Sequence, residues 1–92
     1  MVGCESETVF FKPQGRPLSQ LDEVILLVEE YEAIRLSDFQ ETPQTVASKK
    51  MGISQPTFNR LLSSARKKIS DAIVNGKAIK IEGGHFSLLE EK

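Results

Sequence analysis

The stretch from Thr42 to Lys68 constrains the fold of this chain more than any other, because it predicts two helices with the short break Met51-Gly52-Ile53 between them. Gly52 can turn the chain there, since glycine adopts the left-handed backbone conformation that costs other residues about 1 kcal/mol or more. Ala47 and Ser48 are small enough to let the second helix cross closely over the first. This spacing is typical of a helix-turn-helix, which lays its second helix in the major groove of DNA.

The second helix of the motif is predicted to begin at Ser54 and to end at Asn75-Gly76. Ser54 is the expected N-cap, and because Pro56 has no N–H, the hydroxyl should accept a hydrogen bond from the amide of Thr57. Apolar residues recur at helical spacing and should face the core: Phe58, Leu61, Leu62, Ala65 and Ile69. Met51 and Ile53 should fill the crevice between the two helices.

The other face of this helix is polar and almost free of acids. Its residues are Gln55, Thr57, Asn59, Arg60, Ser63, Ser64, Lys67 and Lys68. Such donors and acceptors are what base edges and phosphates require. The alternative is an ordinary helical hairpin whose lysines and arginines are merely solvated.

Charge is distributed unevenly along the chain. The net charge of −1 and the isoelectric point of about 5.8 argue, taken alone, against a nucleic-acid partner. Residues 43–81, however, hold eight basic residues against the single acid Asp71, whereas residues 1–42 hold nine acids against three basic residues. The sequence therefore predicts a basic face backed by an acidic one, which would steer DNA to one side.

A first helix should start near Glu29 and pack across the hairpin. Tyr31, Ala33, Ile34 and Phe39 are expected to face inward, and Glu29, Glu30, Glu32 and Arg35 are expected to face water. The next helix should take Thr42 as N-cap and Pro43 as its first residue.

Three short stretches are candidate strands. Val9-Phe10-Phe11 could form a short one, and the apolar run Val24–Val28 could be either a buried strand or the start of a helix. Lys77–Glu82 alternates and needs a partner, which we expect to be one of those two stretches. The predicted fold class is mainly α: we expect a three-helix helix-turn-helix domain whose short N- and C-terminal strands pair with each other.

The 92 residues are predicted to form a single domain. It divides into an N-terminal segment (1–27), a helical core (28–76) and a short strand with a tail (77–92). No apolar run approaches the roughly 18 residues of a membrane helix, and the N-terminus lacks the features of a signal peptide, so we expect a cytoplasmic protein.

The residue inventory does not favour an enzyme. His85 is the only histidine and Cys4 the only cysteine, and no group of acids shows the spacing of metal ligands. Gly83-Gly84 is not followed by a helix signal, so it is not a phosphate-binding loop. We therefore expect no catalytic residues, no metal and no cofactor.

Several motifs in fixed order resemble an uncharacterised prokaryotic family of predicted DNA-binding proteins, whose helix-turn-helix is similar to region 4 of sigma factors. The matching stretches are Phe11-Lys12-Pro13, Glu32–Asp38, Met51–Ser54, Thr57-Phe58, Ala65–Lys68 and Asn75–Gly84. The resemblance covers residues 11–84. It implies a helix-turn-helix fold and a role in binding DNA, without supplying a known target.

The chain departs from that family's pattern in three places. Gln55 stands where members commonly have an arginine, which favours a contact to adenine over a bidentate contact to guanine. The first residues lack the usual run of arginines and prolines, and Leu27 with Glu29 replaces a better capping pair before the first helix.

The sequence thus predicts sequence-selective binding of double-stranded DNA, typical of a transcriptional regulator. We expect base-edge contacts from Gln55, Thr57, Asn59 and Arg60. We expect phosphate contacts from Lys49, Lys50, Ser54, Ser63, Arg66, Lys67 and Lys68. A homodimer would supply two half-sites. The alternative is a protein-interaction module that contacts RNA polymerase or a second copy without reading DNA.

Overall fold

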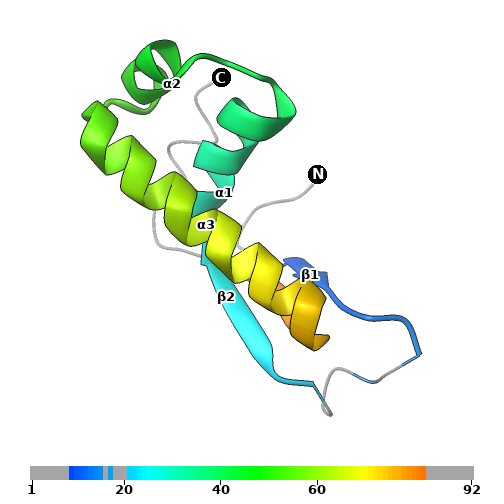
Figure 1. Ribbon diagram of the computed structural model, residues 1–92. Helices are drawn as coiled ribbons and strands as arrows, with labels where there is room; N and C mark the ends of the chain where they lie inside the picture. The colour runs from blue at the N-terminus through cyan, green and yellow to red at the C-terminus, as the bar shows by residue number, and fades with distance from the viewer. Residues whose placement is uncertain (1–8, 16, 18–20, 83–92) are drawn as a thin grey trace.

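The computed structural model describes residues 9–15, 17 and 21–82, which form a mainly helical arrangement with a small sheet at one end (Figure 1). The strands are β1 (Val9–Phe11), β2 (Glu23–Leu27) and β3 (Ala78–Glu82). The helices are α1 (Val28–Ile34), which continues as the π-helix η2 (Arg35–Phe39), then α2 (Gln44–Met51) and α3 (Gln55–Asn75). The predicted fold class is confirmed. The predictions for Cys4 and His85 lie outside the described residues.

The sheet places β3, the last strand described, between the two earlier ones. Its order is β1-β3-β2, with β3 antiparallel to β1 and parallel to β2. Both candidate partners of the predicted C-terminal strand therefore pair with it. The apolar run Val24–Val28, predicted as either a strand or the start of a helix, is divided between β2 and the first residue of α1. Within β2, Val24 and Leu26 are buried while Ile25 and Leu27 are exposed.

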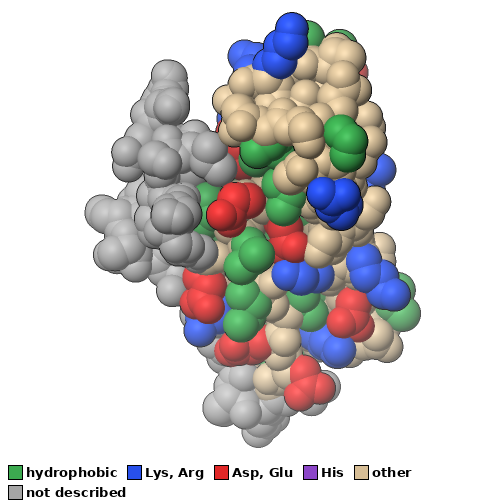
Figure 2. Space-filling view, turned by 90° about the vertical axis from the view of Figure 1, so that its left-hand side faces the viewer, with side chains coloured by type: hydrophobic (Ala, Val, Ile, Leu, Met, Phe, Trp, Pro, Cys, Tyr) green, Lys and Arg blue, Asp and Glu red, His purple; other side chains and the backbone are tan. Residues whose placement is uncertain are grey.

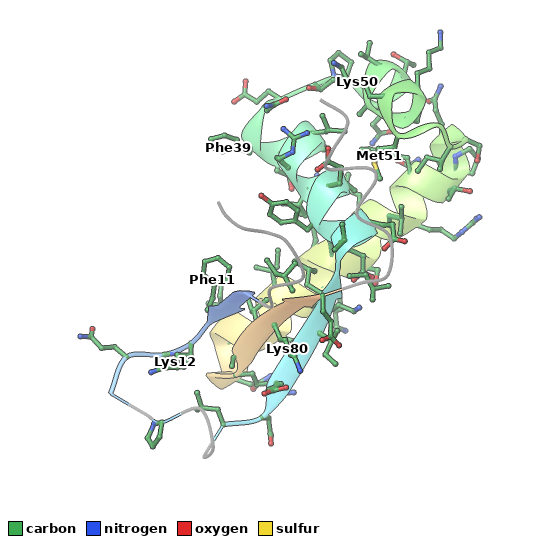
Figure 3. All side chains as sticks on the ribbon, turned by 180° about the vertical axis from the view of Figure 1, so that it is seen from behind. Phe11, Lys12, Phe39, Lys50, Met51 and Lys80 are labelled. Atoms are coloured by element: carbon green, nitrogen blue, oxygen red, sulfur yellow. The ribbon has the colours of Figure 1, made fainter. Side chains whose placement is uncertain are left out.

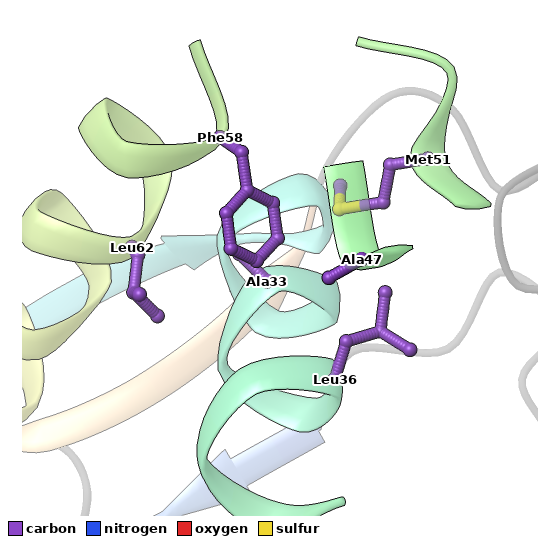
Figure 4. Close-up of a cluster of buried hydrophobic side chains, with 6 residues drawn as sticks. All are labelled: Ala33, Leu36, Ala47, Met51, Phe58 and Leu62. Atoms are coloured by element: carbon purple, nitrogen blue, oxygen red, sulfur yellow. The ribbon is translucent and has the colours of Figure 1, made fainter. Parts of the chain in front are cut away.

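The core lies where the three helices meet, and Figure 4 shows its six side chains. Ala33 and Leu36 come from α1 and η2, Ala47 and Met51 from α2, and Phe58 and Leu62 from α3. Ile53 and Leu61 pack against this cluster. The predicted inward face of α3 and the small residues of α2 are confirmed, because Phe58, Ala65 and Ala47 are completely buried.

The turn and caps of the helix-turn-helix follow the sequence closely. Gly52 ends α2 in the left-handed conformation (φ 72°), and Gly76 ends α3 in the same way (φ 66°). The Ser54 hydroxyl accepts a hydrogen bond from the amide of Thr57 at 3.3 Å, as predicted. The start of α2 was predicted one residue early: Pro43 has an extended backbone and is the N-cap, so Gln44 is the first helical residue.

The predicted faces of the first helix are wrong at three positions. Glu30 and Glu32 are 3% and 5% exposed rather than facing water, and Phe39 is 80% exposed rather than buried. The wider turn of η2 shifts the helical register after Ile34, so Leu36 takes the inward position and Phe39 is rotated out. The two glutamates are buried because each is paired with a basic side chain: Glu30 with Lys68 and Glu32 with Arg35.

Candidate nucleic-acid interface

The polar residues predicted to contact DNA gather at the end of the molecule formed by α2 and the first turns of α3. The exposed ones are Lys49, Lys50, Ser54, Gln55, Asn59, Arg60 and Ser63, and Thr57 is half-buried. Figure 2 shows lysine or arginine side chains at the upper end of one face, and acids interspersed with basic side chains lower down. Residues of both predicted classes of contact are thus exposed on these two helices, and we call this set of exposed residues the α2–α3 surface.

Side-chain hydrogen bonds organise the first turns of α3 at this surface. The Ser54 hydroxyl donates to the Thr57 hydroxyl oxygen at 3.0 Å, and the Arg60 guanidinium donates to the same oxygen at 3.4 Å. Thr57 therefore accepts from residues on both sides of it along the helix. This holds Arg60 along the outer side of α3, and Gln55 and Asn59 stay exposed beside it.

Positive charge is unbalanced at this surface. Among the described residues, Lys49, Lys50 and Arg60 form no ion pair with an acid. Lys49 and Lys50 also lie in the last turn of α2, where the partial negative charge of the helix end favours cations. A ligand with negative charge can approach all three without displacing an acidic side chain, although Arg60 also donates to the Thr57 hydroxyl oxygen.

Farther along α3, Arg66 is already paired. Its guanidinium donates to both carboxylate oxygens of Asp38, at 2.7 Å and 3.1 Å. These hydrogen bonds lower the pKa of Asp38 below its ordinary value. Both side chains are about half exposed, so the pair lies in water, where such pairs are weak.

Lys68 and Ser64 are directed toward the protein rather than toward solvent. The Glu30 carboxylate accepts from Lys68 Nζ at 2.7 Å, from Ser64 Oγ at 2.5 Å and from the Leu27 amide at 2.9 Å. Burial alone would raise the pKa of Glu30, but the hydrogen bonds from Lys68, Ser64 and Leu27 outweigh it and hold the pKa below its ordinary value. We call these groups the Glu30 cluster.

The sequence predicted a basic face backed by an acidic one. The Glu30 cluster and the Arg66–Asp38 pair show that this prediction is wrong in part, because acidic and basic side chains meet there. Acids of α1 and η2 reach across to the middle of α3 and balance two of its basic residues. The predicted basic face is therefore reduced to the α2–α3 surface, together with the exposed Lys67. Ser64, predicted to face outward, is half-buried against Glu30.

The described part of the chain contains neither a cluster of metal-ligating side chains nor a membrane-spanning helix. No group of three or more histidine, cysteine, aspartate or glutamate residues there could hold a metal ion. None of the helices in residues 9–15, 17 and 21–82 is long and apolar enough to cross a membrane.

The sequence of this chain is similar to known proteins that form a family. A family model described as "Protein of unknown function DUF134" matches residues 2–89. A UPF0251 protein of Thermoanaerobacter sp. (strain X514) is 52% identical over 91 residues, which cover 99% of this chain and 80% of the relative. A UPF0251 protein of Moorella thermoacetica is 53% identical over 83 residues, covering 90% and 56% of the two chains. No solved structure shows significant similarity.

Proposed function

Since the chain belongs to the DUF134 family, whose description names no activity, we propose a function from its own geometry: sequence-selective binding of double-stranded DNA. In this proposal α3 enters the major groove and the protein regulates transcription. The observation that carries it is the α2–α3 surface, where a glycine turn, a capped helix and three cations that pair with no acid among the described residues occur together. Proteins that read DNA with a helix-turn-helix use this combination.

The surface suggests a division of work between its residues. Gln55, Thr57, Asn59 and Arg60 lie on the first turns of α3 and would meet base edges, because the N-terminal part of a recognition helix is the part that reaches them. Gln55 and Asn59 end in amides, which pair bidentately with adenine. The Arg60 guanidinium would favour guanine, with which arginine pairs bidentately.

The phosphate contacts would come mainly from the end of α2 and the edge of α3. We assign them first to Lys49 and Lys50, and then to Ser54, Ser63 and Lys67, all of which are exposed. Arg66 and Lys68 would contribute less, since a phosphate would have to compete with Asp38 and Glu30.

The first test is selection of bound duplexes from a randomised DNA pool, followed by affinity measurements across a salt series. We expect an enriched sequence bound about a thousandfold more tightly than scrambled DNA, with an affinity that falls steeply as salt rises. Absence of an enriched sequence, or affinity insensitive to salt, would overturn the proposal.

A second test separates base contacts from phosphate contacts. Asn59→Ala should change which sequence is preferred, whereas Lys50→Ala should weaken all duplexes alike and reduce the salt slope by about 1. Lys80→Ala is the matched control, because it removes the same charge from the sheet, at the opposite end of the molecule from Lys50 (Figure 3). Equal effects of Lys50→Ala and Lys80→Ala would contradict the assignment of the α2–α3 surface.

The competing proposal is a protein-interaction module, for example one that contacts RNA polymerase. Phe39 and Val46, which are 80% and 43% exposed, support it, since apolar side chains beside a basic surface are common in protein interfaces. The salt series discriminates the two, because a protein partner should bind with a much shallower salt dependence than DNA.

A further inference from the structure

We propose that Asp38 lowers the affinity of this chain for DNA of every sequence, because its carboxylate holds Arg66 in the way that a phosphate would. This inference rests on the proposed function, since it concerns the same face of α3. Asp38 belongs to η2 and Arg66 to the middle of α3, 28 residues later. The guanidinium donates to both carboxylate oxygens, at 2.7 Å and 3.1 Å. Two parallel hydrogen bonds to an anion are also how arginine binds a phosphate.

Arg66 lies on the face of α3 that is proposed to meet DNA. It follows Ser63 by three residues and Asn59 by seven, and residues at these spacings share one face of a helix. All three side chains are exposed. Arg66 stands about three turns from the start of α3, whereas base edges are met by the first turns of a recognition helix. The DNA group within its reach is therefore a phosphate.

The exposure of the pair decides how Asp38 acts. The side chains of Asp38 and Arg66 are 41% and 54% exposed, so a phosphate can approach the guanidinium. That phosphate would replace one anion by another and would leave the Asp38 carboxylate as an unpaired negative charge beside the DNA backbone. Arg66 therefore adds little net affinity while Asp38 is present. Lys50 differs from it, because Lys50 forms no ion pair with an acid among the described residues.

The experiment measures the affinity of the full chain for the selected duplex and for a scrambled one across a salt series. Asp38→Asn removes the charge and keeps the shape of the side chain. We expect it to tighten binding to both duplexes by the same factor, about threefold or more, and to steepen the salt slope by about 1. The slope changes because Arg66 then contacts a phosphate. The variant should keep the circular dichroism of the parent, since an exposed ion pair contributes little to stability.

Asp71→Asn is the matched control for the loss of one negative charge. Asp71 is 31% exposed and also forms an ion pair, but its partner Lys77 lies beyond the end of α3 and is not a proposed DNA residue. The salt slope of this variant should equal that of the parent. If Asp71→Asn steepened the slope as much as Asp38→Asn, the gain would be a general effect of net charge, and the proposal would be overturned.

Arg66→Ala shows whether Asp38 acts through Arg66. In the parent it should weaken binding less than Lys50→Ala does, and in the Asp38→Asn background it should cancel the added slope. Equal effects of Arg66→Ala in the two backgrounds would overturn the inference about Asp38, while a steep salt dependence of the parent would leave the proposed function standing. A parent chain that binds no duplex at any salt concentration would overturn both together.

Discussion

At the scale of single residues, Glu30 differs most from what its sequence position suggests. It lies in an acidic stretch that looks like the water-facing side of a helix, yet its side chain is 4% exposed. Donors from Leu27, Ser64 and Lys68 satisfy its two oxygens, and they tie the start of α1 to the middle of α3. The sequence could not reveal this, because Ser64 and Lys68 are 34 and 38 residues away and only the packing of α1 on α3 brings them close.

Removing Lys68 should therefore cost stability. Lys68→Met would leave the buried carboxylate without its cation, and since Lys68 itself is 31% exposed we expect a loss of about 2 kcal/mol in the free energy of unfolding. Adding Glu30→Gln to that variant should recover part of the loss, because the unpaired charge is then removed. Urea unfolding measures both, and Lys67→Met is the control on an exposed neighbouring lysine, expected to change stability by less than about 0.5 kcal/mol. A larger effect of Lys67→Met than of Lys68→Met would contradict this account.

The same carboxylate should make stability depend on pH in a definite direction. The pKa of Glu30 is lower in the folded chain than its ordinary value of 4.5, so its stabilising contribution is fully present above that value and is lost as pH falls through the lowered one. Unfolding curves from pH 7 downward should show the parent losing stability in this acid range faster than Glu30→Gln. Parallel curves for the two proteins would show that Glu30 does not titrate as described.

At the scale of elements, the sequence predicted those features that depend on local backbone chemistry. Gly52, Ser54 and Gly76 mark helix ends because of their own conformations and hydrogen bonds, and all three were assigned correctly. The run before α1 remained ambiguous because Val24, Ile25, Leu26 and Leu27 are apolar on both faces of the strand. The prediction that Phe39 faces inward was wrong because the sequence carries no signal for the π-helical turn, which rotates this side chain outward.

The turn between α2 and α3 allows a test that separates backbone strain from steric fit. A Cβ atom at Gly52 would meet no atom within 4 Å, so only the left-handed conformation (φ 72°) opposes substitution. Gly52→Ala should cost about 1 kcal/mol, and the larger Gly52→Asn should cost less, since asparagine adopts this conformation more readily. Thermal unfolding of the two variants gives the order, and a greater loss for asparagine than for alanine would point to a steric contact instead.

At the scale of the whole molecule, charge and apolar surface occupy opposite ends. Cations that pair with no acid among the described residues lie on the α2–α3 surface, whereas the exposed apolar residues Ile73 and Phe11 line a groove beside the sheet. Most candidate DNA residues could be identified from the sequence because they follow one face of α3, and Lys49 and Lys50 stand at the end of α2. The sequence could not show that Arg66 and Lys68 differ from the other candidates by being paired with acids. Those ion pairs form only because α1 and η2 pack against α3.

The central place of β3 in the sheet has a consequence for how the protein is made. The helices α1, α2 and α3 leave the ribosome before the strand that separates β1 from β2, so the sheet beneath α3 cannot close until Glu82 has emerged. The backbone of β2 stays unpaired while the whole helix-turn-helix is synthesised, because among the described residues β2 pairs only with β3. Closing a parallel pair over so long a separation is slow compared with forming the helices. Of the strands that the structure describes, the last to be translated is thus the one that completes the sheet.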